Sequence, residues 1–135
     1  MSEEPIFERA AGRAAEHQLP YAGAVTPQEA HQLRAAGAAA IVDVRTLSEY
    51  RDVGRVDGTA LIEWRRDGEQ QPDPRFLERL RQQYRPDDAL LFLCRSGVRS
   101  HYAAQVAAAA GFTRAYNVLD GFEKGWRPAG LPWVR

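Results

Sequence analysis

The sequence predicts an α/β fold whose central sheet is mostly parallel and is flanked by helices on both faces. Two observations support this prediction. Short apolar runs of strand length, of which residues 39–44 and 89–93 are the clearest, alternate along the chain with segments of helical pattern. These two runs contain almost no polar residue, which is typical of strands in a parallel sheet that helices cover on both faces.

Length and composition predict one domain with a single core. The chain has 135 residues, of which 44% are hydrophobic and 27% are charged. Lys plus Arg and Asp plus Glu both number 18, so no overall charge attracts nucleic acid or a membrane surface. No run has the length of a membrane span, the N-terminus lacks the pattern of a secretory signal, and one cysteine cannot form an internal disulfide. We therefore expect a cytoplasmic protein that binds neither nucleic acid nor membrane.

The first part of the chain is predicted to form a helix, a strand and a second helix. Residues 5–17 have a modest apolar face, with which this helix packs on the domain or contacts a second copy of the chain. Residues 19–25 form a short, irregular strand. The segment Thr26-Pro27-Gln28-Glu29 has the pattern of a capping box with proline at the first helical position, and it starts a helix that ends at Gly37.

The middle of the chain continues with the strand at residues 39–44, a short strand at 59–62 and a polar loop at 64–73. Between the two strands, Thr46-Leu47-Ser48-Glu49 is a second capping-box pattern that opens a short helix. A further helix starts at residue 73. Its inward-facing side chains are expected to be Phe76, Leu77, Leu80 and Tyr84.

The last part of the chain contains the strand at residues 89–93, a helix over 101–110, a strand at 115–118 and a short helical segment at 122–126. Gly111 ends the longer helix, because glycine is favoured just after a helix C-terminus. Strands thus alternate with helices throughout. In parallel sheets of this kind ligands bind beyond the carboxyl ends of the strands, and we expect the functional site at that edge.

The segment Cys94-Arg95-Ser96-Gly97-Val98-Arg99-Ser100 joins the second apolar strand to a helix and contains the only cysteine. Unpaired N–H groups and the helix dipole stabilise an anion at such a position, and the two arginines strengthen the effect. A reactive thiolate at Cys94 is therefore expected. The alternative is an inert, buried cysteine, as most single cysteines are. That alternative does not explain why two like charges are placed together at a helix start.

Three groups of residues resemble, in order and spacing, the signatures of the rhodanese domain family. The first group is Asp43-Val44-Arg45, Glu49-Tyr50 and Gly54-Arg55-Val56-Asp57-Gly58-Thr59. The second is the Cys94 loop with Ala103-Ala104, and the third is Gly111-Phe112, Tyr116-Asn117-Val118, Gly121, Trp126 and Gly130-Leu131-Pro132. The resemblance implies a rhodanese-like domain over residues 21–135, with residues 1–20 as an N-terminal helical extension. Two departures are Arg55-Val56-Asp57, where the family commonly has His-Ile-Pro, and Asp120-Gly121, where it has two glycines.

What the resemblance implies is a sulfurtransferase, without a cofactor, whose catalytic residue is Cys94. The thiolate takes a sulfane sulfur from thiosulfate or a similar anionic donor, holds it as a persulfide, and passes it to cyanide, a thiol or a sulfur-accepting protein. The expected substrate-binding residues are Arg95, Ser96, Gly97, Val98, Arg99 and Ser100, whose backbone N–H groups cradle the persulfide. Arg99 is expected to bind an oxyanion with its guanidinium, and Arg95 to point outward along the rim.

Two other functions stay open. One is a persulfide carrier or protein-binding module of the same family that does not turn over freely. The other is a cysteine phosphatase or arsenate reductase. The second is disfavoured because four residues separate Cys94 from Arg99, one fewer than in cysteine phosphatases. Turnover with thiosulfate and cyanide distinguishes the enzyme from the carrier.

Several side chains outside the loop are candidates for roles near it. Trp64 and Arg65 follow the strand at 59–62 and either form a pocket wall or belong to a solvated loop. His101 lies just past the loop and either tunes Cys94 or, as we expect, stands on the helix surface. Asp43, Arg45 and Glu49 are expected to be structural and to tie the short helix to the sheet. Trp126 and Trp133 are expected to pack in the core. The three histidines, His17, His31 and His101, are too dispersed along the chain for a metal site.

Overall fold

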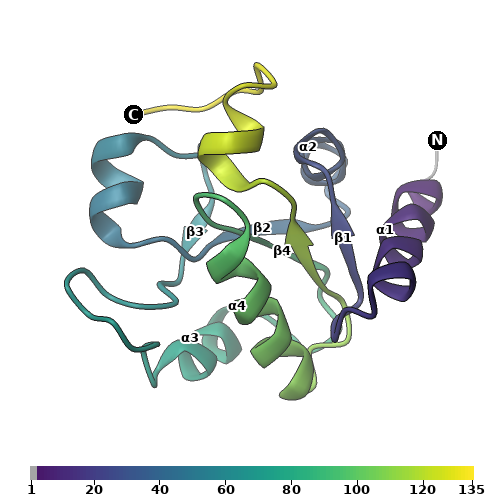
Figure 1. Cartoon of the computed structure of the whole chain (residues 1–135), viewed down its shortest axis with the longest axis horizontal. Helices are drawn as coiled ribbons and strands as arrows, with labels where there is room; N and C mark the ends of the chain where they lie inside the picture. The colour runs from purple at the N-terminus through teal and green to yellow at the C-terminus, as the bar shows by residue number, and fades with distance from the viewer. Residues whose placement is uncertain (1–2) are drawn as a thin grey trace.

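The computed structural model describes residues 3–135 and contains a five-stranded sheet in which all neighbouring strands are parallel (Figure 1). The strand order is β1-β5-β4-β2-β3. The strands are β1 (Gly23–Val25), β2 (Ala40–Asp43), β3 (Ala60–Leu61), β4 (Leu90–Leu93) and β5 (Ala115–Val118). The sheet confirms the α/β fold predicted from the alternation of apolar runs and helical segments.

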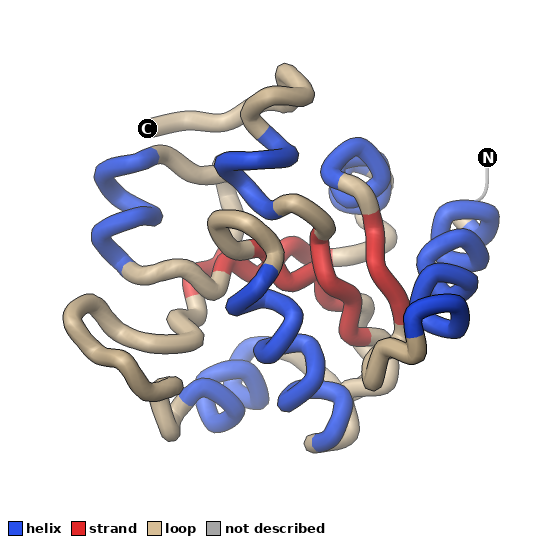
Figure 2. The backbone as a smooth tube through the Cα atoms, viewed as in Figure 1, coloured by secondary structure: helices blue, strands red, loops and turns tan. Residues whose placement is uncertain are grey.

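In the described part of the chain, four α-helices and two π-helical turns surround the sheet, which lies at the centre of Figure 2. They are α1 (Glu4–His17), α2 (Pro27–Ala35), η1 (Glu49–Val53), α3 (Phe76–Gln83), α4 (Val98–Ala109) and η2 (Phe122–Trp126). Two buried clusters form the core: one joins the sheet to α1, α2 and η2, and the other joins it to α3 and α4. Helices thus cover both faces, as predicted. Within residues 3–135, no helix is long and apolar enough to cross a membrane.

Strand β4 explains why an uninterrupted apolar run was a good predictor of the fold. All four of its residues are buried. Successive side chains of a strand point to opposite faces, so Leu91 enters the cluster with α2 and Phe92 the cluster with α3 and α4. The strand needs apolar residues at every position because both faces are covered.

Helix α1 packs on the domain, which is the first of the two arrangements expected for its apolar face. Gly23 of β1 permits this packing, because a Cβ atom there would lie 2.7 Å from the backbone carbonyl of Ala10. The Arg13 guanidinium donates a hydrogen bond to the carbonyl oxygen of Ala24 at 2.8 Å, and it binds Glu29 of α2 at 2.7 Å. Residues 1 and 2 of the predicted extension lie outside the described residues.

Element boundaries differ from the sequence-based expectation at three places. Helix α4 begins at Val98 rather than at residue 101, because Gly97 has a φ of 98° and turns the loop directly into the helix. Helix α3 begins at Phe76 rather than at residue 73, because the Asp73 carboxylate accepts the Arg75 N–H at 2.9 Å and holds a turn there. The capping box at Thr46 is present but opens the π-helical turn η1, whereas the one at Thr26 caps α2 as predicted.

Candidate active site

Cys94 lies at the carboxyl end of β4, where the sequence predicted it, and its side chain is buried. Its carbonyl oxygen accepts the N–H of Phe122 at 2.8 Å, so η2 holds the start of the loop in place. The approach is close at Gly121, where a Cβ atom would lie 2.5 Å from the Cys94 carbonyl oxygen. Backbone contacts therefore hold the position of Cys94 independently of the side chains of the loop.

The sulfur atom of Cys94 contacts two polar groups of its own loop. The Gly97 N–H donates a hydrogen bond to Sγ at 3.1 Å. The Ser100 hydroxyl lies 3.2 Å from Sγ. Because α4 begins at Val98, Ser100 stands in the first helical turn, and its hydroxyl faces back into the loop. Both groups are donors that an anion on the sulfur would use.

Asn117 of β5 closes these contacts into one network. Its Oδ1 accepts the Ser100 hydroxyl at 2.6 Å, and its Nδ2 donates to the Gly97 carbonyl oxygen at 3.2 Å. We call the linked groups of Cys94, Gly97, Ser100 and Asn117 the closed network. Ser100 has a single hydroxyl proton, so it accepts from a Cys94 thiol while it donates to Asn117. A thiolate or persulfide would instead draw that proton toward sulfur.

Sequence reasoning assigned no role to Asn117. The signal that points to it is a polar residue within a strand, residues 115–118, that is buried along its whole length. Buried polar side chains in native proteins are almost always hydrogen-bonded, and here the partners belong to the Cys94 loop. A polar residue in a buried strand beside a reactive loop is therefore worth testing as a positioning residue.

Asp43 and Arg45 form a buried ion pair behind the loop. The Arg45 Nη2 atom lies 2.8 Å from the Asp43 carboxylate and donates to the Gly54 carbonyl oxygen at 2.7 Å. The guanidinium also stacks over the Phe122 ring, with 4.5 Å between its central carbon and the ring centroid. The pair ties the segment after β2 to the sheet, as the sequence analysis expected for these residues.

Arg99 has a partner that the sequence analysis did not assign to it. Its two terminal nitrogens bind the two carboxylate oxygens of Glu49 at 2.7 and 2.9 Å. Burial favours the neutral form of Glu49, but the hydrogen bonds from Arg99 and from the Thr46 N–H outweigh it and lower the pKa of Glu49 to about 2. The guanidinium was expected to face the loop concavity for a donor; instead its fork binds Glu49.

Arg95 differs from Arg99 in both its exposure and its side-chain contacts. Its side chain is exposed, as expected for a position on the rim, and among residues 3–135 it has neither a hydrogen-bond nor an ion-pair partner. It lines a cavity of about 280 Å³ together with Arg45, Glu49, Val53 and Glu123. We call this cavity the rim cavity. Val98, another loop residue, is 61% exposed.

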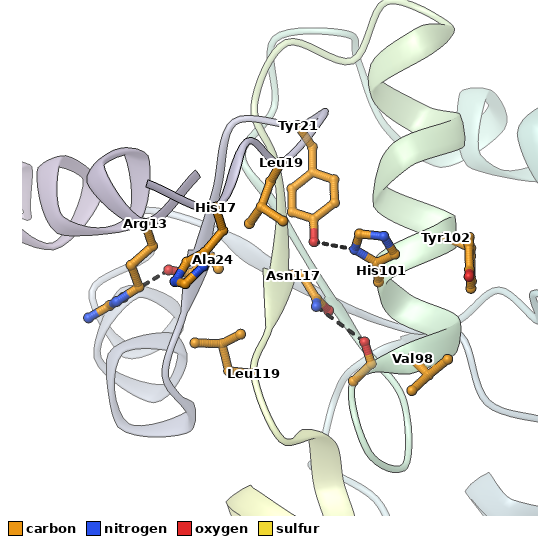
Figure 3. A pocket seen from close by; sticks show the side chains of 11 residues that line it. Arg13, His17, Leu19, Tyr21, Ala24, Val98, His101, Tyr102, Asn117 and Leu119 are labelled. Atoms are coloured by element: carbon orange, nitrogen blue, oxygen red, sulfur yellow. Dashed lines mark hydrogen bonds between the residues drawn. The ribbon is translucent and has the colours of Figure 1, made fainter. Parts of the chain in front are cut away.

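A larger cavity of about 460 Å³ lies on the other side of the loop (Figure 3). His101 of α4 lines this cavity and is partly exposed, and its Nδ1 atom lies 2.6 Å from the Tyr21 hydroxyl. Side chains from α1, the segment before β1, α4 and β5 enclose the cavity. They include Arg13, His17, Leu19, Tyr102, Asn117 and Leu119.

Of the tryptophans, Trp126 has the predicted role, whereas the role of Trp64 stays a prediction. Trp126 is fully buried and its indole N–H donates to the Pro132 carbonyl oxygen at 2.8 Å, which confirms core packing. Trp64 packs edge-on against Phe76 with 5.2 Å between ring centroids. Neither Trp64 nor Arg65 lines the rim cavity or the larger cavity, so their role as a pocket wall stays a prediction. Across residues 3–135, no group of three His, Cys, Asp or Glu side chains could hold a metal ion.

A sequence profile, a solved structure and two relatives are similar to this chain. The sequence profile described as "Rhodanese-like domain" matches residues 26–128. The crystal structure of Rv0390 from M. tuberculosis is 40% identical, with a TM-score of 0.73, and the match covers 84% of this chain and 97% of that one. An uncharacterized protein, RP600 from Rickettsia prowazekii, is 38% identical over 101 residues, covering 69% of this chain and 80% of the relative. The thiosulfate sulfurtransferase GlpE from Glaesserella parasuis is 31% identical over 108 residues, covering 80% and 89%.

Proposed function

Because the chain belongs to the rhodanese-like domain family, we propose that it is a sulfurtransferase that carries sulfane sulfur as a persulfide on Cys94. The observation that supports this most directly is the closed network. It directs the Gly97 N–H and the Ser100 hydroxyl at Sγ, at 3.1 and 3.2 Å. Preorganised donors of this kind stabilise negative charge on a buried sulfur.

The proposed reaction has two half-reactions that share the persulfide. In the first, the Cys94 thiolate attacks the outer sulfur of thiosulfate; the Sγ–S bond forms, the donor S–S bond breaks, and sulfite leaves with that electron pair. In the second, cyanide or a thiolate attacks the outer sulfur. The Sγ–S bond then breaks and its electron pair returns to Cys94. A covalent intermediate of this kind divides one transfer into two easier steps and predicts ping-pong kinetics.

The other functions differ from this proposal in testable ways. A persulfide carrier of the same family would form the same intermediate and hand it to a protein partner without free turnover. A cysteine phosphatase needs room for a tetrahedral phosphate in the loop, and here four residues separate Cys94 from Arg99. Arg99 is also bound to Glu49 rather than free to bind phosphate. Both features disfavour a phosphatase.

The test is the intact mass of the protein before and after incubation with thiosulfate, followed by cyanide. We expect one added sulfur atom that cyanide removes as thiocyanate. Cys94→Ser should gain none and should keep its thermal stability nearly unchanged. A Cys94→Ser variant that still transfers sulfur would contradict the persulfide mechanism. Sulfur retained by the parent after cyanide, but released to a protein thiol, would favour the carrier.

A further inference from the structure

The arginines around the Cys94 loop are almost all bound to carboxylates. Arg45 binds Asp43, Arg99 binds Glu49, and Arg127 binds Glu123 at 2.6 Å. Within residues 3–135, Arg95 is the one of these four arginines whose side chain binds no carboxylate. The loop therefore holds one uncompensated guanidinium, and that one is exposed to solvent.

The Glu49–Arg99 pair uses the hydrogen-bonding geometry that an oxyanion donor would need. A guanidinium binds a carboxylate or a sulfonate through two parallel N–H donors, and Glu49 occupies both. The exposed fraction of the two side chains is 17% for Arg99 and 23% for Glu49, so solvent screens the pair only in part. The Glu49 carboxylate is itself held by the Thr46 N–H at 3.1 Å, which fixes it opposite the arginine.

We propose that Glu49 is a specificity-determining residue that withholds Arg99 from oxyanion donors and so favours organic hydropersulfides, R–S–SH, as the sulfur source. This inference rests on the proposed sulfurtransferase function. Thiosulfate is a dianion. To bind the Arg99 guanidinium it has to displace Glu49, and in the rim cavity it meets the Glu49 and Glu123 carboxylates beside the Arg45 and Arg95 guanidinium groups. A hydropersulfide presents a terminal sulfur without an attached oxyanion, so it needs no guanidinium fork.

The transfer from a hydropersulfide balances without a further reactant. The Cys94 thiolate attacks the outer sulfur of R–S–SH and forms the Sγ–S bond. The donor S–S bond breaks, and R–S⁻ leaves with its electron pair, while the proton stays on the transferred sulfur. The closed network then holds the Cys94 persulfide as it would after loading from thiosulfate.

The experiment compares two donors in single-turnover loading of the full chain, read by intact mass and by the rate of sulfur gain. The donors are thiosulfate and cysteine hydropersulfide, with persulfidated serum albumin as a third arm to separate small from protein-bound hydropersulfides. The variants are Glu49→Gln, Glu123→Gln and the double variant Glu49→Gln/Arg99→Gln. Each single variant removes one negative charge from the rim cavity, but only Glu49→Gln removes the carboxylate that binds both terminal nitrogens of Arg99. The amide that replaces the Glu49 carboxylate keeps an oxygen for the Thr46 N–H.

We expect the parent to load faster from hydropersulfide than from thiosulfate. Glu49→Gln should raise the thiosulfate rate about tenfold, the size of one charge-assisted hydrogen bond gained, and leave the hydropersulfide rate within about twofold. Glu123→Gln should change neither by more than about twofold. The double variant should lose the faster loading from thiosulfate, because that increase requires the Arg99 guanidinium. The comparison between the single and the double variant is valid even if Glu49→Gln is less stable than the parent.

Two outcomes overturn the inference by itself. One is an unchanged ratio of the two loading rates in Glu49→Gln, and the other is a gain that survives in the double variant. A parent that gains no sulfur from any of the three donors overturns the proposed function, and the inference falls with it. Loading by cysteine hydropersulfide alone, or by serum albumin as well, identifies the source of the hydropersulfide.

Discussion

The two sides of the Cys94 loop are built from different interactions. On the side of β5, neutral groups of Gly97, Ser100 and Asn117 form the closed network around the sulfur. On the side of β2, charged groups of Glu49 and Arg99 bind each other. On the neutral side, the Gly97 N–H and the Ser100 hydroxyl lie against the sulfur. On the ionic side, the charges of Glu49 and Arg99 neutralise each other. The groups within hydrogen-bond distance of the sulfur are therefore neutral dipoles, whereas the Arg99 charge is already paired with a carboxylate.

The largest expected effect comes from breaking the ionic side at its most buried pair. Arg45→Met leaves the Asp43 carboxylate buried without its cation, and both side chains are almost fully excluded from solvent. We expect a loss of about 3–5 kcal/mol in the free energy of unfolding, measured by urea denaturation. Arg51→Met, which breaks an exposed pair with Asp52, is the matched control and should change little. A loss below about 1 kcal/mol for Arg45→Met would show that the pair is not required.

A smaller effect is expected from opening the closed network on the neutral side. Asn117→Ala leaves the Ser100 hydroxyl and the Gly97 carbonyl oxygen without this partner, which should cost about 1–3 kcal/mol of stability. Because the Ser100 hydroxyl and the N–H of the same Gly97 contact the sulfur, sulfur loading of Cys94 should slow. Comparison with Cys94→Ser/Asn117→Ala separates the stability loss from the effect on sulfur. Loading at the parental rate would show that Asn117 does not position the loop.

The Glu49–Arg99 pair predicts a stability difference that depends on pH. The pKa of Glu49 is lowered from 4.5 to about 2, so the stabilisation is fully present above pH 4.5 and is lost as the pH falls through about 2. The parent should therefore be more stable than Glu49→Gln by about 1–3 kcal/mol at neutral pH, after allowance for partial exposure. The difference should shrink below about pH 4 in parallel denaturation curves. A difference that stays constant down to about pH 2.5 would contradict the assignment.

The smallest expected effect is at Arg95, the exposed cation of the loop. Arg95→Gln should change the free energy of unfolding by no more than about 0.5 kcal/mol, because the side chain has no partner among residues 3–135. Thermal denaturation of this variant beside Arg45→Met places the two extremes on one scale. A large loss at Arg95 would mean that the rim carries a structural contact.

The sequence predicted the fold and the position of Cys94 because both depend on local patterns. Apolar runs mark the strands, and the strand-to-helix junction places Cys94 at the sheet edge. The partner of Arg99 could not be read in this way: Glu49 lies fifty residues earlier and meets Arg99 only because β2 and β4 are neighbours in the sheet. Asn117 was missed for the same reason, since β5 is the other neighbour of β4. Charges in a motif show which groups are present, but strand order decides which of them pair.

Helix α1 also has a consequence for how the chain behaves while it is being made. Strand β1 is one of the two outer strands of the sheet, and an unprotected outer strand can pair with other chains. Arg13 of α1 binds the Ala24 carbonyl oxygen, and Gly23 lets the helix lie against the strand. Strand β1 pairs with β5, which is synthesised much later, whereas α1 precedes β1 directly. Because α1 precedes β1 in the chain, it can pack on this strand during translation before β5 has been synthesised.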